Sequence, residues 1–558
     1  RHIENGEPPR DAALQGAREI GFTVLSMSLS LVFVLLPTAF MSGVVGRMFR
    51  EFSFTVIAAV VVSAIVSLTL APMLCARWIK PVRSEHGMWY RRIESGFEKL
   101  AEGYRKTLDW ALVRAPWVLA AFVATVILTV LLAWEIPKGF FPEQDTGLIG
   151  ALADASQSVS PRQMQQLERQ IDAIVGQDPA VAGVASWTGS TGGNGFAQTQ
   201  NTARYFIVLK PRSQRSLLAP RIIERLQHAL RGVDNATLHM QATQDITVGG
   251  RTSRGNFEYT LQDADFDQLR HWSAKMLAAM HNLPEIEGVA SDLQDSAPQM
   301  TIGIDRAKAA SLGVSVQAID DTLYDAYGQR QISQYFTQVS TYPLILEVTP
   351  EQLHRLTSFN DLYVTSTTTG APIPLSTFVT IDTDTTGPLS IVHQGQFPAV
   401  NLSFNLRPGV SLGQAVTAIR QAARTIGMPE AVTGTFTGNA GAFQKSLSSL
   451  AWMFLLTVLA VYVVLGVLYE DFIHPLTILS TLPSAGLGAL VALYLAHMDL
   501  SVIGMIGVVL VTGIVKKNGI MLVDFAIAAE RERGLAPLQA IREACILRFR
   551  PILMTTSA

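Results

Sequence analysis

The sequence predicts an α-helical polytopic membrane protein with a large α+β domain outside the membrane. Only 16% of its 558 residues are charged and 49% are hydrophobic, whereas soluble domains have roughly 25% charged residues. Six long apolar runs are each long enough to cross a bilayer, which takes about 20 residues. Between the third and fourth runs, the apolar residues recur with the two-residue period of strands or the three-to-four-residue period of helices.

The composition argues against several other classes of protein. The chain carries 43 Lys+Arg and 45 Asp+Glu, a net charge of −2, whereas a nucleic-acid binder has a basic bias. No Gly-Lys dipeptide occurs, so the chain has no Walker A site, and we expect neither an ATPase nor any other enzyme. The ten histidines show no metal-ligand spacing. We therefore expect no metal site and no cofactor.

The apolar runs predict membrane-spanning helices. They are residues 20–46, 52–76, 115–134, 446–469, 472–498 and 500–529. Buried helices of a soluble protein are the alternative, but such helices are usually shorter and amphipathic. Residues 551–558 resemble the start of a further, truncated span, and the chain begins without Met. We therefore expect a fragment of a larger membrane protein.

Basic residues near the spans predict the orientation, because cytoplasmic loops are enriched in Lys and Arg. Nine lie in 77–114 and five in 530–550, a predicted loop, and the number of spans between them puts both segments on the same side. We expect this side, with residues 1–19, to be cytoplasmic and residues 135–445 to be outside. Cys75 and Cys545 both lie at cytoplasmic span ends, so the outer domain lacks cysteine, which fits an oxidising compartment such as the periplasm.

An amphipathic helix is predicted within the cytoplasmic segment. Apolar residues recur at three- and four-residue steps through 88–113, with Arg and Glu on the other face. A helix of this kind can lie at the membrane interface. The alternative is that it packs against another cytoplasmic helix.

The outer domain is predicted to contain two βαββαβ units, the ferredoxin-like pattern. The first, in 135–254, has strands at 147–154, 180–188, 203–210 and 236–243, and helices that begin at Pro161 and near 219. The second is divided between 255–293 and 389–445. An α+β insertion, 294–388, separates its halves, with expected strands at 300–304 and 344–348 and a helix at 315–327. A glycine-rich segment, 189–195, is either a mobile loop beside a binding cleft or a plain surface loop.

Three charged residues interrupt the sixth apolar run: Lys516, Lys517 and Asp524. A charge at membrane depth costs about 2.5–3.5 kcal/mol on insertion scales and by default indicates function. At about 100° per residue, Lys517 and Asp524 share a helix face, whereas Lys516 is expected nearer the edge of the bundle. Lys517 then needs carboxylates from a span outside this chain. The alternative is a helix end whose lysines extend to the interface.

Several short motifs along the whole chain point to one protein family. They are Gly16-Ala-Arg-Glu-Ile-Gly21, Arg47-Met-Phe-Arg-Glu-Phe52, Leu70-Ala-Pro-Met-Leu-Cys75, Ile136-Pro-Lys-Gly-Phe-Phe-Pro-Glu-Gln-Asp145, Gly513-Ile-Val-Lys-Lys-Asn518 and Arg548-Phe-Arg-Pro-Ile-Leu-Met-Thr555. These motifs resemble those of resistance–nodulation–division (RND) efflux permeases. Within the hydrophobe/amphiphile-efflux branch, the sequence is most similar to Mdt- and Mux-type multidrug permeases, through Gln329-Arg-Gln-Ile332 and the segment 474–483. The resemblance covers roughly the second half of such a permease.

This resemblance implies a proton-driven antiporter of the Gram-negative inner membrane that exports drugs and other amphiphilic compounds. Its implied partners are protons, a periplasmic adaptor protein, an outer-membrane channel and further permease subunits, as a homotrimer or a mixed trimer with a related permease. The two βαββαβ units would be porter subdomains and 294–388 a docking subdomain. Such pumps confer antibiotic resistance.

The resemblance also implies site residues. The proton relay would use Lys517, Arg548 and Thr555, with Asp524 and Asn518 as further candidates. The candidate substrate-binding residues are Phe196, Phe206, Gly192, Gly193, Met240 and Gln241. The family's pocket phenylalanines are missing near 239–242, where the sequence is His-Met-Gln-Ala, which indicates a more polar pocket.

Two other functions remain open at this point. One is export of lipids or metal ions by a transporter of the same superfamily. The other is a non-transporting membrane sensor or scaffold with a ligand-binding outer domain. A scaffold has no need of Lys517 inside the bilayer, whereas a proton carrier does.

Overall fold

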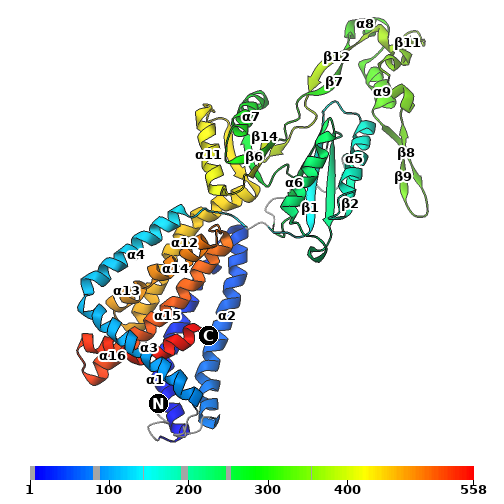
Figure 1. Cartoon of the computed structure of the whole chain (residues 1–558). Helices are drawn as coiled ribbons and strands as arrows, with labels where there is room; N and C mark the ends of the chain where they lie inside the picture. Colours follow the sequence, from blue (N-terminus) through cyan, green and yellow to red (C-terminus); the bar gives the residue numbers. More distant parts are fainter. Residues whose placement is uncertain are drawn as a thin grey trace.

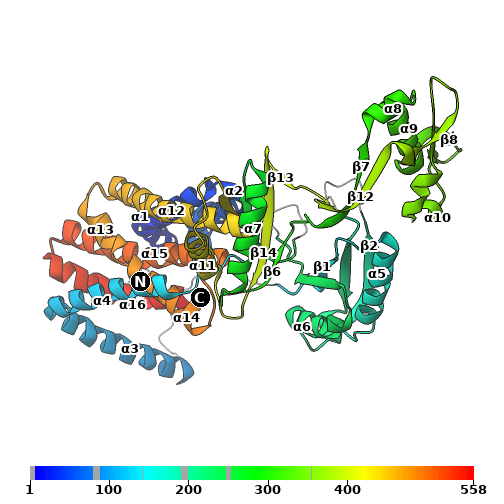
Figure 2. The same cartoon turned by 90° about the horizontal axis from the view of Figure 1, so that it is seen from above.

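The computed structural model describes residues 7–78, 88–141, 144–189, 199–246, 253–353 and 355–557. A bundle of long helices forms one end of the molecule, two α/β units lie beyond it, and a third unit lies farthest from the bundle (Figure 1). Seen from above, the two α/β units lie side by side and the third projects away from them (Figure 2).

Six helical segments among the described residues are long and apolar enough to cross a membrane. They belong to α1 (Pro9–Ala39), α2 (Gly43–Trp78), α4 (Ala115–Glu135), α12 (Gly438–Tyr469), α13 (Ile473–Leu479) with α14 (Leu482–Leu495), and α15 (Val502–Arg533). Each contains most of one of the expected spans.

One predicted span boundary is wrong, and another predicted span is interrupted. The first span was expected to reach residue 46, but α1 ends at Ala39 and a new helix starts at Gly43, whose φ of +85° lies in the left-handed region. The fifth span is two helices, because α13 ends at Leu479 and α14 starts at Leu482, with Pro483, which has no N–H to donate, in its first turn. Neither break changes the local hydropathy, so composition did not reveal them.

The predicted loop 530–550 is largely helical, which corrects the sequence-based boundary. Gly534, with φ +64°, ends α15, and α16 (Pro537–Ser557) begins three residues later. Pro551, the expected start of a span, lies inside α16.

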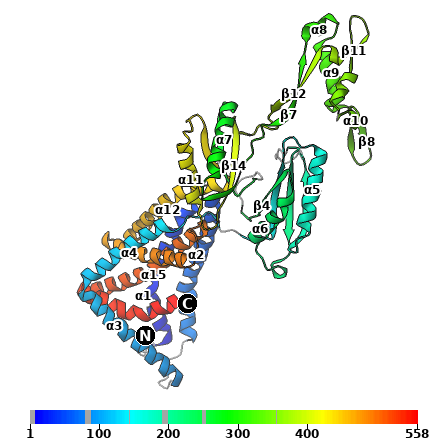
Figure 3. The same cartoon turned by 45° about the horizontal axis from the view of Figure 1, so that its top comes forward.

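The amphipathic helix α3 (Met88–Val113) packs against α16. Arg542 donates two hydrogen bonds to the Asp109 carboxylate at 2.5 and 2.9 Å, and the Tyr104 ring stacks on Phe549 with centroids 4.3 Å apart. Figure 3 shows the two helices side by side at the end of the bundle farthest from the α/β units. The structure thus has the helix–helix packing that was the alternative to a helix lying alone at the interface.

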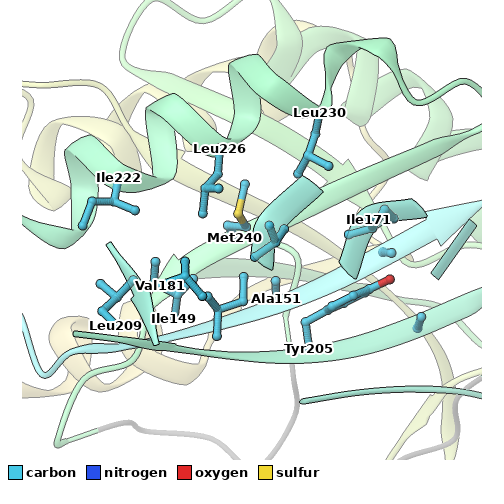
Figure 4. Close-up of a cluster of buried hydrophobic side chains, with 14 of the residues drawn as sticks. Ile149, Ala151, Ile171, Val181, Tyr205, Leu209, Ile222, Leu226, Leu230 and Met240 are labelled. Carbon is cyan, nitrogen blue, oxygen red and sulfur yellow. The ribbon is translucent and has the colours of Figure 1, made fainter. Parts of the chain in front are cut away.

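The first α/β unit has one antiparallel sheet with two helices on one face. Its elements are β1 (Leu148–Ala155), α5 (Pro161–Gly176), β2 (Val181–Thr188), β3 (Thr202–Leu209), α6 (Ala219–Ala229) and β4 (Ala236–Ala242), and the strand order is β2-β3-β1-β4. Ser160 caps α5 by accepting a hydrogen bond from Gln163 N. The apolar faces of α5 and α6 cover Ile149, Tyr205 and other side chains of the sheet (Figure 4).

The second α/β unit repeats this plan with a divided chain. It contains β5 (Phe257–Gln262), α7 (Phe266–His281), β6 (Ile286–Ser291), β13 (His393–Gln394), β14 (Phe397–Leu406), α11 (Leu412–Thr425) and β15 (Thr433–Thr437). The sheet order is β13-β14-β5-β15, and β6 also pairs with β14. A capping box between Ser411 and Gln414 begins α11.

The third unit is inserted between β6 and β13. Its longer elements are β7 (Ala297–Ile304), α8 (Arg306–Ser311), α9 (Val316–Tyr327), β8 (Arg330–Phe336), β9 (Thr341–Leu346) and β12 (Val379–Gly387). The short elements α10 (Pro350–Leu353), β10 (Tyr363–Thr365) and β11 (Pro372–Pro374) complete it. Its small core includes Ile319, Leu375 and Phe378.

Candidate functional site

A cavity of about 660 Å³ lies between the two α/β units. On one side, its walls come from β1, β3 and β4 of the first unit. On the other side, they come from β5 and β14 of the second unit and from the start of α12. The lining residues are Gly150, Ala151, Arg204, Phe206, Gln241, Ala242, Thr243, Gln244, Ser253, Gly255, Asn256, Glu258, His393, Gln394, Gly395, Asn401, Thr437, Gly438 and Asn439. The volume is in the range of small-molecule sites, about 300–1,000 Å³. We call this cavity the inter-unit cleft.

Strand β3 divides its side chains between the core and the inter-unit cleft, because successive residues of a strand point to opposite faces. Tyr205 and Ile207 are fully buried under the helices, at 0% exposure. Arg204 and Phe206 lie on the other face and line the cleft. The alternative in which Phe206 is a core residue facing the helices is therefore wrong.

Arg204 and Phe206, which line this wall of the inter-unit cleft, belong to an aromatic and cationic cluster with Trp187 of the neighbouring strand β2. The Phe206 and Trp187 rings lie 5.6 Å apart between centroids. The Arg204 guanidinium carbon lies 5.2 Å from the Phe206 centroid and 5.9 Å from that of Trp187. Contacts of this kind contribute about 0.5–2 kcal/mol. The cluster offers a flat apolar surface with a fixed positive charge beside it.

The remaining walls are polar. Gln241 Nε2 donates to Ser253 O at 3.3 Å, and Thr437 Oγ1 donates to the Glu258 carboxylate at 3.3 Å. Amide, hydroxyl and carboxylate groups therefore line the inter-unit cleft together with the Phe206 ring. This arrangement can hold a molecule that has both an apolar ring system and polar groups.

Only some of the candidate substrate-binding residues that the structure describes line the inter-unit cleft. Phe206 and Gln241 line the inter-unit cleft. Met240 does not: it is 5% exposed and belongs to the core under α5 and α6, so its placement in a pocket is wrong. The reason is strand alternation, because β4 turns neighbouring residues to opposite faces. Phe196, Gly192 and Gly193 lie outside the described residues.

A partly buried ion cluster links the chain between the two units to the first sheet. Arg254, which precedes β5, donates to both Asp154 carboxylate oxygens at 2.5 and 2.8 Å. His239 Nε2 lies 3.4 Å from Asp154 Oδ2. Burial of the imidazole lowers the pKa of His239. The cluster fixes the path of the connecting chain at one side of the inter-unit cleft.

Asp145 is the last residue of the motif that begins at Ile136. It links the segment before β1 to the start of α6. Both its oxygens accept hydrogen bonds from Arg215, at 2.7 and 2.6 Å, and Ala219 N donates at 3.0 Å. These contacts, chiefly the Arg215 hydrogen bonds, lower the pKa of Asp145 to about 2. The sequence singled out the motif but not this role.

We expect Asp145→Ala to destabilise the first α/β unit by about 2–3 kcal/mol, because the guanidinium of Arg215, whose side chain is only 4% exposed, loses its carboxylate and keeps only the carbonyls of Lys210 and Leu217. The thermal midpoint of the purified protein measures this loss. Because the folded-state pKa of Asp145 is below its ordinary 3.8, its stabilising contribution is complete above about pH 4 and is lost as the pH falls through 2. Glu224→Ala, in an exposed pair with Arg221, is the matched control and should have almost no effect. An equal loss in both variants would contradict this role.

A second cavity, of about 1,080 Å³, lies where the bundle meets the second unit. The end of α4, the face of α11 and the start of α12 line it, with Trp134, Lys138, Glu285, Arg420 and Phe443 among the side chains. It therefore lies at the boundary between the apolar helices and the α/β units.

The charged residues of α15 have a different arrangement from the one predicted. Lys516 is 1% exposed, and its Nζ donates to Ser30 O of α1 at 2.7 Å. Lys517 is half-buried and, among the described residues, has no ion pair. The expectation that Lys516 lies at the edge of the bundle is therefore wrong, because α1 packs against the face of α15 that carries Lys516.

The other relay candidates lie on α15 and α16. Thr23 Oγ1 donates to Asp524 Oδ2, and Asp524 also interacts electrostatically with Arg548 of α16. The Arg548 guanidinium lies 3.3 Å from the Phe525 ring centroid. Thr555 is exposed and donates to Ile552 O of its own helix, and Asn518 is half-buried. The structure thus brings Asp524 and Arg548 together, whereas the hydrogen bond that it shows for the Thr555 side chain among the described residues stays within α16.

No group of three or more His, Cys, Asp or Glu side chains suited to a metal ion occurs within the described residues. Within the described part of the chain, the inter-unit cleft and the charges of α15 are the features that bear most directly on transport. Together, the apolar helices, the cleft and the intramembrane charges define a multi-pass membrane transporter.

Comparison with known families identifies this transporter class. Residues 1–558, the whole chain, match the AcrB/AcrD/AcrF family. The chain belongs to this family of RND permeases, which are efflux transporters and not ATPases.

Proposed function

We propose that this protein is a proton-driven antiporter that exports drugs and other amphiphilic compounds, most like the Mdt- and Mux-type permeases. The observation that supports this best is the combination of two features in one chain. Lys516, Lys517 and Asp524 lie in a membrane-spanning helix, and the inter-unit cleft has the volume of a small-molecule site.

The proton supplies the energy and Lys517 responds to it. Carboxylates on a span outside these 558 residues pair with Lys517 while they are ionised. When they take up protons, this pairing is lost and the ammonium needs another partner. A proton that moves inward releases about 2.3 kcal/mol per 100 mV of membrane potential. That energy can move the spans between two discrete arrangements, with Arg548 and Thr555 along the path.

The inter-unit cleft binds the substrate in this proposal. The Phe206 ring, which packs beside Trp187, takes the apolar part of an amphiphile, and the amide side chains and Arg204 take its polar part. The two α/β units, 135–254 and 255–293 with 389–445, act as porter subdomains. The second cavity, at the end of α4, lies where an amphiphile leaving the membrane can enter.

The proposed location is the inner membrane of a Gram-negative cell, with 135–445 in the periplasm. We propose a trimer, of identical chains or with a related permease, that joins a periplasmic adaptor and an outer-membrane channel. The insertion 294–388 would be the docking subdomain. Its hairpin β8–β9 favours a partner protein at this position. Tyr335, Phe336 and Val339 are exposed, and an isolated two-stranded hairpin is only marginally stable, so a bound partner would cover these residues and stabilise the hairpin.

Labelling of a single cysteine tests the orientation. Ser213→Cys, in a short 3-10 turn of the first α/β unit, should react with a membrane-impermeant maleimide in cells whose outer membrane alone is permeabilised. Cys75 and Cys545 are replaced by serine in this background. Labelling that requires permeabilisation of the inner membrane would put the domain on the opposite side.

Transport by the complete pump in proteoliposomes tests the function. An imposed pH gradient should drive uptake of an amphiphilic dye, and a protonophore should abolish it without any dependence on ATP. Dye binding with no transport under the gradient would favour a sensor or scaffold instead.

A further inference from the structure

A polar seam runs between α1 and α15, inside the bundle. We define the α1–α15 seam by five residues: Thr23, Ser26, Ser30, Lys516 and Asp524. The three hydroxyl residues are between 0% and 2% exposed, and Lys516 is 1% exposed. The relay proposed for Lys517 uses neither Lys516 nor these hydroxyl groups.

The hydroxyl groups lie on one face of α1, spaced to connect the two charges. Thr23, Ser26 and Ser30 follow each other at steps of three and four residues, which are about 4.5 and 6 Å along a helix. Lys516 and Asp524 are eight residues apart, about 12 Å along α15. At one end of the seam, Thr23 Oγ1 donates to Asp524, and at the other, Lys516 Nζ donates to Ser30 O at 2.7 Å.

Between these two ends, the Ser26 hydroxyl is buried and has no protein partner among the described residues. A lone buried hydroxyl is costly in a membrane, where no bulk solvent satisfies it. The Lys516 ammonium has three N–H donors and the described residues occupy one of them. A water molecule that bridges such groups can satisfy them, because a buried water makes hydrogen bonds to two to four polar partners.

We propose that Lys516 is a second proton-carrying group of this pump and that the α1–α15 seam is its route toward the cytoplasm. The Lys516 ammonium gives one proton to a water-and-hydroxyl chain at Ser26. The Asp524 carboxylate accepts a proton from the chain and releases it on the cytoplasmic side. The amine of Lys516 is then protonated again from the periplasmic side. This inference rests on the proton-driven transport proposed above.

The charged groups around the seam support proton movement from Lys516 toward Asp524. Arg548 of α16 and Tyr469 of α12 interact electrostatically with Asp524, and Glu19 of α1 interacts with Arg548. Lys517 is the neighbour of Lys516 on α15. On the remaining helices packed against α15, His474 of α13 faces Asp471 and Tyr494 of α14 is exposed. Charge therefore gathers at the Asp524 end, while the described partner of Lys516 is a carbonyl group.

Exchange of lysine for arginine separates proton transfer from a structural role. Arginine keeps the positive charge but stays protonated in proteins. In proteoliposomes with the complete pump, Lys516→Arg should bind the dye as the wild type does but lower the drug-dependent proton flux at least about ten-fold. Lys516→Met should lower it equally. Wild-type flux in Lys516→Arg would overturn the proposal, because only a fixed charge would then be needed.

The hydroxyl route has its own test, which does not alter any charge. Ser26→Ala should slow the proton flux several-fold, and Ser26→Thr, which restores a hydroxyl, should recover it. Ser28→Ala, two residues away on another face of α1, is the matched control and should keep the wild-type flux. Equal fluxes in Ser26→Ala and Ser28→Ala would overturn the route.

Lys517→Ala distinguishes failure of this inference from failure of the proposed function. If Lys517→Ala blocks transport while the Lys516 and Ser26 variants behave as the wild type does, the α1–α15 seam alone is wrong. If the wild-type pump shows no drug-dependent proton flux, the proton-driven function itself is wrong.

Discussion

Lys517→Ala is expected to abolish drug efflux, with a loss of about 100-fold or more, while the protein still folds and binds drug. Lys517 is half-buried on a membrane-spanning helix and, within the described part of the chain, has no ion pair. Its proposed partners are carboxylates of another span, and a neutral alanine cannot respond to their protonation. Dye efflux from cells that make the complete pump measures the loss.

The control for this variant is a lysine outside the membrane. Lys106, on α3, is 75% exposed in its side chain, and its ion-pair partner among the described residues is Glu102 of the same helix. Lys106→Ala should retain wild-type efflux, since exposed pairs contribute about 0–1 kcal/mol. If Lys517→Ala also exports dye at the wild-type rate, Lys517 has no relay role and is a lysine that extends to the interface.

Two neighbouring residues of β3 should give opposite results. Tyr205 is 0% exposed in the core of the first α/β unit. Truncation of a large buried aromatic residue costs about 3–5 kcal/mol, so Tyr205→Ala should sharply reduce the amount of folded pump. Phe206 lines the inter-unit cleft instead, so Phe206→Ala should leave the amount of folded pump unchanged and alter the set of drugs exported.

The size of the Phe206 effect depends on the drug. Burying an aromatic side chain against a ligand contributes roughly 1.5–3 kcal/mol, or about 10- to 100-fold in affinity, for ligands that contact it. Drug-susceptibility profiles with immunoblots of the membrane fraction measure both quantities for the two variants. Equal loss of folded protein in Phe206→Ala and Tyr205→Ala would contradict the assignment of Phe206 to the cleft.

Local patterns predicted the elements of this fold well. Apolar length alone located the membrane helices, and strand and helix periods located α5, β3 and α11, because each pattern reflects contacts made by one face of one element. The break between α13 and α14 was not predicted, since an apolar run looks the same with or without it. The hairpin β8–β9 was only half predicted, because its exposed apolar residues follow no one-sided pattern.

The candidate site depends more on contacts between distant segments. The angle between Lys516 and Asp524 follows from the helix alone, but which lysine is buried depends on α1, whose Ser30 is 486 residues away in sequence. Met240 was assigned to the pocket from its position in the chain, although alternation with Gln241 allows only one of the two to face the inter-unit cleft. The same alternation, applied to Phe206, would have found Arg204 as well.

The most direct test of the account is the proton flux that drug addition causes in proteoliposomes. The complete pump is reconstituted with a pH-sensitive dye in the lumen, a pH gradient is imposed and the amphiphilic substrate is added. The account predicts that substrate accelerates proton movement by the wild type and that Lys517→Ala binds the substrate with no such acceleration. Substrate-dependent proton movement at the wild-type rate in Lys517→Ala would contradict it.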